Sequence, residues 1–170
     1  MDLRVQPVDE KHIRISGLTP VLTAMLHELP EILELRDSSA ARDRLFPNPT
    51  DDDRVNKDWR QTTGPELRHL FASAGEIVTR DLITMNAETD PAKSDEITFP
   101  IEHVNAWMSA INQARLILAE VHNIDEAEMN RTDLDPRRPR DAAALRIHVL
   151  GYLLHLFVEL ENGDEPADSV

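Results

Sequence analysis

Hydrophobic residues recur at helical spacing through residues 100–124, and strong helix signals flank this stretch on both sides. At about 100° per residue, its apolar side chains fall on one arc of roughly 200°. An arc that wide indicates a helix with neighbours on two or three sides. The apolar arc consists of Ile101, Val104, Trp107, Met108, Ala110, Ile111, Ala114, Ile117, Leu118 and Val121. We therefore predict that a helix at about residues 100–123 forms the centre of the fold.

Two further long helices are predicted by the same periodicity. Residues 65–86 carry a continuous apolar stripe, and residues 141–162 are more than half apolar. Gly163 is the expected stop of the second helix, because glycine readily adopts the left-handed conformation at a helix end. The apolar stripe of the helix at residues 65–86 consists of Leu67, Leu70, Phe71, Ala74, Ile77, Val78, Leu82 and Met85. Both helices offer enough apolar surface to pack against the central one.

Two shorter helices begin at recognisable caps. Thr19 and Pro20 suit the cap and first position of a helix that we expect to kink or break just before Pro30. Thr50 is the expected cap of a second helix, which ends near residue 62. The aspartates at residues 51–53 suit the first turn of that helix and lack the spacing and the glycine of a calcium loop.

The N-terminus alternates between apolar and polar residues, which predicts a β-hairpin at about residues 3–15. Residues 96–99 are a candidate third strand. The sequence thus predicts a mainly α fold, in which about five principal helices pack in a bundle-like or orthogonal arrangement around the central one. We expect a single domain at residues 1–163 and a disordered acidic tail at residues 164–170.

Composition excludes several kinds of chemistry. The chain has 170 residues and no cysteine, which rules out disulfides, thiolate catalysis and thiol redox sensing. The sequence has neither a run of about 18 apolar residues nor a signal peptide, so we expect a cytoplasmic protein with no membrane contact. No phosphate loop, dinucleotide fingerprint or nucleophile motif is present, so neither an enzyme nor a cofactor is predicted.

The charge of the chain bears on its partners. Asp and Glu number 32 against 18 Lys and Arg, a formal net charge of −14, which opposes binding to nucleic acid. The densest basic segment contains Arg137, Arg138 and Arg140, and we interpret it as a solvated loop beside a helix start. We therefore expect a protein partner and no direct contact with nucleic acid. A homodimer is left open.

Two charged residues fall on apolar stripes. Asp81 lies within the stripe of residues 65–86, and Arg115 lies near the edge of the central arc. A buried charge costs several kcal/mol unless it is paired. We therefore predict a buried ion pair between Asp81 and Arg115 that sets the register of the two helices, with a polar switch or ligand site as the alternative.

Metal chemistry has few candidates. His148, His155 and Glu159 share one strip of the last predicted helix, and His155 and Glu159 are one turn apart. Histidines on the polar side of an amphipathic helix are usually only solvated, so we predict no metal and keep these three residues as a minor alternative. Glu66 and His69 form a single Glu-x-x-His motif, whereas di-iron bundles need two.

Several motifs resemble a bacterial family that was long described as a domain of unknown function and is named for AosR, an oxidative-stress transcriptional regulator. The similarity covers residues 18–160. The matching residues include Arg44, Phe46, Pro47, Trp59, Arg60, Trp107, Asn112 and Arg115. Gln113 departs from the pattern, since the family often has Asp there, and thiol sensing, which is associated with the namesake, is excluded here because the chain has no cysteine.

The resemblance implies a cytosolic, non-enzymatic protein, and family members are often encoded beside the adaptor of the Clp protease. We expect a regulatory protein that acts through protein–protein contact, for example with a sigma factor or a polymerase subunit, in transcription or stress response. The alternatives are an adaptor or scaffold in Clp-type proteolysis, and a helical bundle with a metal site.

Overall fold

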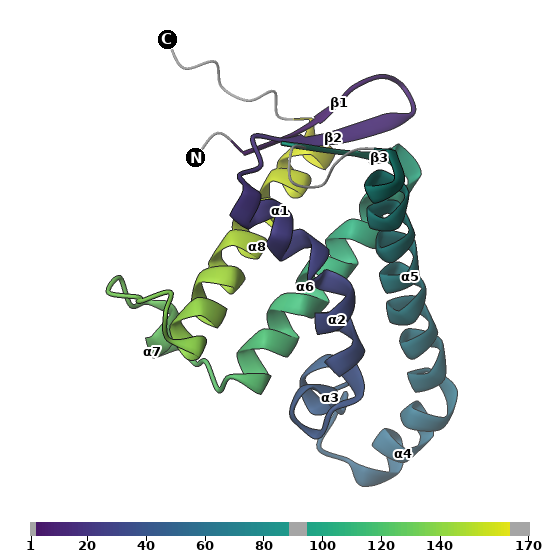
Figure 1. The fold of residues 1–170 in the computed structure, drawn as a ribbon. Helices are drawn as coiled ribbons and strands as arrows, with labels where there is room; N and C mark the ends of the chain where they lie inside the picture. The colour runs from purple at the N-terminus through teal and green to yellow at the C-terminus, as the bar shows by residue number, and fades with distance from the viewer. Residues whose placement is uncertain (1–2, 89–94, 164–170) are drawn as a thin grey trace.

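The computed structural model describes residues 3–88 and 95–163; the predicted tail at residues 164–170 lies outside them. The expected mainly α fold with a small N-terminal sheet is confirmed (Figure 1). In chain order the elements are β1 (Arg4–Pro7), β2 (His12–Ser16), α1 (Pro20–His27), α2 (Leu29–Glu34), the 3-10 turn η1 (Leu35–Asp37), α3 (Ser39–Leu45), α4 (Asp53–Thr62), α5 (Gly64–Glu88), β3 (Glu96–Pro100), the 3-10 turn η2 (Ile101–His103), α6 (Val104–Val121), α7 (Glu126–Met129) and α8 (Pro139–Asn162).

Helix α6 is the central helix that the sequence predicts, but it begins at Val104 and not near residue 100, because Pro100 belongs to β3 and Ile101–His103 form η2. It contacts α2, α3, α5 and α8, so it has neighbours on several sides. Five of its side chains are fully buried: Trp107, Ala110, Ile111, Ala114 and Ile117. The wide apolar arc therefore reports the position of this helix correctly.

The sheet closes one end of the helical body. Its strands pair antiparallel in the order β1-β2-β3, so residues 96–99 do add the third strand. The core side of the sheet consists of Ile13, Ile15, Ile97 and Phe99. The ring of Phe99 stacks on Trp107 of α6 with 4.8 Å between centroids and lies 6.2 Å from the ring of Phe157 of α8. These contacts join the sheet to both helices.

The first helix begins and breaks as predicted. The hydroxyl of Thr19 accepts a hydrogen bond from the N–H of Leu22 at 3.3 Å, which caps α1. The chain then breaks between α1 and α2, just before Pro30. Proline has no N–H and its ring clashes with the preceding turn, so a continuous helix is disfavoured there.

The predicted cap of α4 is wrong by two residues. Asp52, rather than Thr50, caps the helix, and its Oδ1 accepts from the N–H groups of Arg54 at 2.8 Å and Val55 at 3.4 Å. The hydroxyl of Thr50 instead accepts from the N–H of Asp52 at 3.2 Å. A carboxylate is a good cap because it also carries the negative charge that a helix start favours.

Helix α8 is apolar on more than the side that it buries. One side packs on α6 and β1. Only 33% of its most apolar 18-residue window is buried, and by length and composition this helix is able to cross a membrane. A core helix of a soluble protein meets the same criteria, so this property is weak evidence for a membrane.

Candidate functional site

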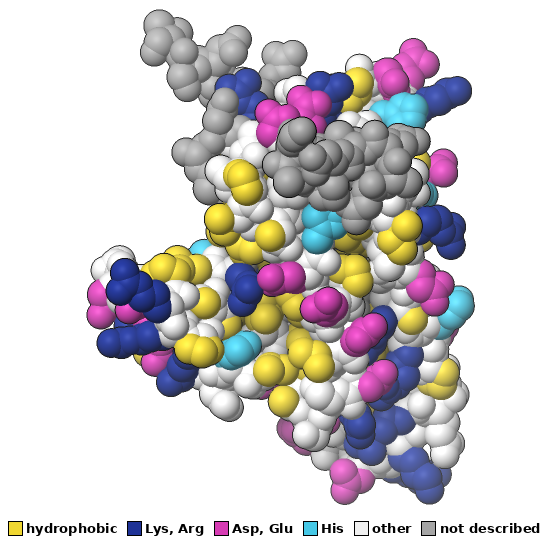
Figure 2. Space-filling view, viewed as in Figure 1, with side chains coloured by type: hydrophobic (Ala, Val, Ile, Leu, Met, Phe, Trp, Pro, Cys, Tyr) yellow, Lys and Arg dark blue, Asp and Glu magenta, His cyan; other side chains and the backbone are white. Residues whose placement is uncertain are grey.

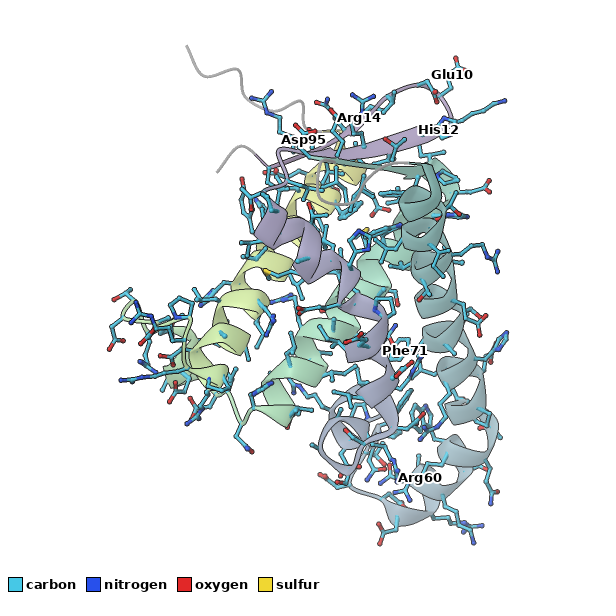
Figure 3. All side chains as sticks on the ribbon, in the orientation of Figure 1. Glu10, His12, Arg14, Arg60, Phe71 and Asp95 are labelled. Carbon is cyan, nitrogen blue, oxygen red and sulfur yellow. The ribbon has the colours of Figure 1, made fainter. Side chains whose placement is uncertain are left out.

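A cavity of about 640 Å³ lies at the end of the molecule opposite the sheet, between α3, the loop that follows it, α4 and the start of α5. We call it the arginine pocket and define it by five of its lining residues: Arg42, Phe46, Trp59, Arg60 and Arg68. Figure 3 shows Arg60 far from Arg14 and His12, which lie on the sheet. Lys and Arg side chains gather over this end of the protein (Figure 2).

Neighbouring groups hold the three arginine side chains in place. Arg60 donates from Nε and Nη2 to Oδ1 of Asn48, at 3.2 and 2.8 Å. Arg42 donates from Nη2 to the backbone carbonyl of Asp37 at 2.9 Å, and Arg68 donates from Nη1 to the carboxylate of Asp37 at 2.9 Å. Two of the three anchors are uncharged oxygens, so they orient the guanidinium groups without neutralising them.

Aromatic rings form the other walls of the arginine pocket. The guanidinium carbon of Arg68 lies 4.2 Å from the centroid of the Phe46 ring, which is a cation–π contact. Phe46 in turn lies 5.5 Å from the ring of Phe71. Trp59 is half-buried in the wall contributed by α4. The pocket therefore combines positive charge with flat apolar surface.

The buried carboxylate of Asp81 lies beneath the sheet, away from the arginine pocket. Its side chain is 8% exposed, and Trp107 Nε1 donates to its Oδ2 at 2.9 Å. Nδ1 of His103 lies 3.0 Å from both carboxylate oxygens. When His103 is protonated, this contact is an ion pair. The burial predicted for Asp81 is correct, and its partners are an indole and an imidazole.

The predicted pair between Asp81 and Arg115 is wrong: among the described residues, no ion pair joins them. Arg115 follows Trp107 by eight residues on α6, which is about 12 Å along the helix. Its Nε is buried with no hydrogen-bond partner among the described residues, and it lies 3.3 Å from the point where a Cβ on Gly151 would stand. Arg115 therefore packs against α8, on another side of α6, and does not reach Asp81.

The metal candidates on α8 are only partly brought together. Nε2 of His155 lies 3.1 Å from the carboxylate of Glu159, and the two side chains are 63% and 46% exposed. His148 lies about two turns earlier on the same helix. Within the described residues, no group of three or more His, Cys, Asp or Glu side chains is placed to hold a metal ion.

The basic segment at the start of α8 is engaged with acidic neighbours. Arg140 donates to the backbone carbonyl of Asn123 and lies 3.4 Å from Glu128. Nearby, Asp141 is 3% exposed and accepts from the N–H of Asp135 and from Arg131, each at 3.0 Å. The N–H of Asp135 and then the charge of Arg131 lower the pKa of Asp141 below its ordinary value. This corner is a structural ion-pair network.

The residues that carry the family resemblance fall into two groups. Phe46, Pro47, Trp59 and Arg60 all line the arginine pocket, and no pattern in the sequence predicts that they meet. The others lie elsewhere: Arg44 is 3.8 Å from Glu120, Trp107 and Arg115 lie in the helix interfaces described above, and Asn112 is exposed. Sequence analysis missed Arg42 as a site residue, since its only signal is the density of arginines between residues 36 and 68.

A second feature is the solvent side of α8, which we call the α8 outer face. It is defined by residues at helical spacing: Leu145, His148, Val149, Tyr152, His155, Leu156 and Glu159. Tyr152 at its centre is 43% exposed, and Leu145, Val149 and Leu156 are half-buried. This face mixes apolar and polar side chains along about four turns of helix.

Comparison with known proteins identifies the family of the chain. No curated protein matches this sequence, and no solved structure does. A family model matches residues 15–160, which include all of the helices described above apart from the last two residues of α8. The chain therefore belongs to the family described as "Domain of unknown function (DUF2017)".

Proposed function

We propose that this protein is a non-enzymatic regulatory protein that acts by contacting another protein through the α8 outer face. The observation that carries the proposal is that only 33% of the most apolar window of α8 is buried. Tyr152 stands at the centre of this face and is 43% exposed. Exposed apolar surface with a polar rim commonly marks a protein contact, and tyrosine is enriched in such contacts.

The charge of the chain favours a basic partner. The formal net charge is −14. Opposite net charges hasten the encounter of two proteins and suppress wrong partners. The same charge disfavours contact with naked DNA, so any role in transcription would be exerted through a protein.

The resemblance to the AosR-like family supports a role in transcription or stress response, with a sigma factor or a polymerase subunit as the contacted protein. This chain has no cysteine, so such a role would not be gated by a thiol. The second candidate is an adaptor or scaffold in Clp-type proteolysis, which the gene neighbourhood of that family favours. Both roles place the protein in the cytoplasm and use the same kind of contact.

The experiment compares partner capture by two charge-insertion variants in native lysate. Tyr152→Glu places a charge at the centre of the α8 outer face. Ile83→Glu is the matched control, because Ile83 is also an exposed apolar residue, 62% exposed, and lies on α5. We expect the wild type and Ile83→Glu to retain the same partner and Tyr152→Glu to lose it, as measured by quantitative mass spectrometry.

The identity of the captured protein separates the candidates. A sigma factor or a polymerase subunit supports the transcriptional role, and a Clp component supports the adaptor role. Equal capture by Tyr152→Glu and the wild type would rule out the α8 outer face as the contact. A wild-type protein that binds lipid vesicles through α8, or that only associates with itself, would replace the proposal with a membrane or homo-oligomer function.

A further inference from the structure

The arginine pocket has a charge that the rest of the chain does not share. Residues 36–80 contain eight Lys and Arg and eight Asp and Glu, whereas the whole chain has a formal net charge of −14. The excess negative charge therefore lies outside the part of the chain that forms this pocket. Three arginines, Arg42, Arg60 and Arg68, face one cavity within it.

The guanidinium groups are held in place and keep free donors. An arginine has five N–H donors. Arg60 donates from Nε and Nη2 to Asn48, and its Nη1 has no partner among the described residues. Among the described residues, Arg42 uses only its Nη2, which donates to the backbone carbonyl of Asp37. Because these side chains are already ordered, an incoming anion meets oriented donors and orders little on binding. Guanidinium groups with free N–H donors are suited to carboxylate and phosphate oxygens.

The carboxylates at the site do not cancel the positive charge. Asp43 is the acidic residue that lines the cavity, and Asp37 is bonded to Arg68 at its edge. Three guanidinium groups against two carboxylates leave one positive charge. The local charge therefore favours an anion in a protein whose overall charge repels one.

The aromatic walls add a second requirement for the ligand. Arg68 stands over the Phe46 ring at 4.2 Å, so that ring already has a partner. The indole of Trp59 is half-buried in the cavity wall, beside Gly64, which carries no side chain to cover it. A cavity of about 640 Å³ lies within the range of roughly 300–1,000 Å³ of ordinary small-molecule sites. It has room for an apolar group beside the anion.

We propose that the arginine pocket binds a small molecule that carries a phosphate or carboxylate group on a flat ring. The oxyanion is bound by the free donors of Arg42 and Arg60, and the ring lies against Trp59. This site is separate from the α8 outer face, and the proposal does not rest on the protein contact proposed above.

Tryptophan fluorescence of the full chain tests the proposal directly. The chain has two tryptophans: Trp59 lines the cavity, and Trp107 is fully buried in the core. We expect phenyl phosphate and benzoate each to give a saturable change in emission at constant ionic strength. In Trp59→Phe that change disappears, which assigns the signal to the pocket. The two probes distinguish a phosphate source from a carboxylate source.

Two further probes separate the anion from the ring. Inorganic phosphate carries the anion alone and phenol carries the ring alone, and each is titrated as a competitor of phenyl phosphate. We expect both to compete at least about fivefold more weakly than phenyl phosphate, since each provides only one of the two contacts. Inorganic phosphate that binds as tightly as phenyl phosphate would overturn the part of the proposal that concerns the ring.

Charge-removing variants provide the decisive control. Arg60→Gln and Arg42→Gln each remove a donor from the arginine pocket, and we expect each to weaken phenyl phosphate binding about tenfold. Arg54→Gln removes the same charge from an exposed position on α4 that does not line the cavity, and we expect a change of less than about twofold. A thermal midpoint equal to that of the wild type shows that each variant is folded.

Three results would overturn the proposal. The first is no saturable change with either ring-bearing probe up to its solubility limit. The second is a signal that persists in Trp59→Phe. The third is an equal loss of affinity in Arg54→Gln and Arg60→Gln, because binding would then follow overall charge and not the pocket.

Discussion

The two ends of the helical body place charged side chains in opposite circumstances. Beneath the sheet, Asp81 is 8% exposed and lies within hydrogen-bond distance of His103 and Trp107. At the other end, Arg42 and Arg60 are exposed around a cavity and keep free donors. The carboxylate is therefore part of the core, whereas the arginines belong to a surface.

The difference follows from the cost of burial. A buried polar group must be hydrogen-bonded, so the fold is stable only if donors lie beside the carboxylate of Asp81. An exposed guanidinium is satisfied by water and needs no protein partner for stability. Anchors such as Asn48 on Arg60 are therefore not required for folding, and they orient groups that a ligand is able to use.

The two tryptophans provide the largest test of this comparison. Trp107 is fully buried, stacks on Phe99 and donates to Asp81, whereas Trp59 is half-buried in the pocket wall. We expect Trp107→Ala to lower the free energy of unfolding by about 3–5 kcal/mol. Trp59→Ala should cost less than about half as much, because less apolar area leaves water on folding. Urea denaturation measures both, and equal losses would contradict the comparison.

The two aspartates provide the next test. Asp81→Ala leaves the N–H of Trp107 buried without its acceptor, and we expect a loss of about 1–3 kcal/mol in the free energy of unfolding. Asp43→Ala, in the wall of the arginine pocket, should change it by no more than about 0.5 kcal/mol, because that side chain is exposed. A larger loss for Asp43→Ala would show that the pocket is part of the folding core.

Periodicity was sufficient to predict the helical core. The stripes of α5, α6 and α8 are visible because each helix carries apolar residues at helical spacing, although Leu70 of the α5 stripe is 59% exposed and only 33% of the most apolar window of α8 is buried. The α5 stripe correctly marks Asp81 as buried. Periodicity predicts which face of a helix is buried, but it does not predict which residues along the axes of two packed helices lie next to each other. Periodicity also treats tryptophan as apolar, so it does not predict that the indole N–H of Trp107 donates to Asp81.

Hydrophobic periodicity does not predict the arginine pocket. Its residues come from three helices and a loop, and they meet because α4 ends at Thr62 and α5 begins at Gly64 in a new direction. The hydrophobic pattern of a single helix does not predict the angle between the axes of α4 and α5. The density of arginines was visible in the sequence, but it does not distinguish a solvated surface from a lined cavity.

Arg115 allows a smaller and sharper test of the corrected pairing. Its Nε is buried and has no hydrogen-bond partner in the part of the chain that the structure describes, so Arg115→Met removes a poorly satisfied group and keeps most of the apolar length. We expect a change of no more than about 1 kcal/mol in the free energy of unfolding. In the double variant with Asp81→Ala, the two effects should add within about 0.5 kcal/mol. A coupling of several kcal/mol would restore the ion pair that the sequence suggested.

Asp141 provides the smallest effect and a third environment for comparison. Like Asp81 it is buried, at 3% exposure, but its partners are the N–H of Asp135 and the half-buried Arg131. These contacts lower the pKa of Asp141 in the folded protein. A carboxyl group with a lowered folded-state pKa stabilises the fold fully above its unfolded pKa of about 3.9, and this contribution is lost as the pH falls towards the folded-state value.

We therefore expect the free energy of unfolding of Asp141→Asn to fall less steeply than that of the wild type below about pH 4. Asp58→Asn, at an exposed position on α4, is the matched control and should follow the wild type. Parallel curves for all three proteins would mean that the network around Asp141 contributes nothing to acid stability.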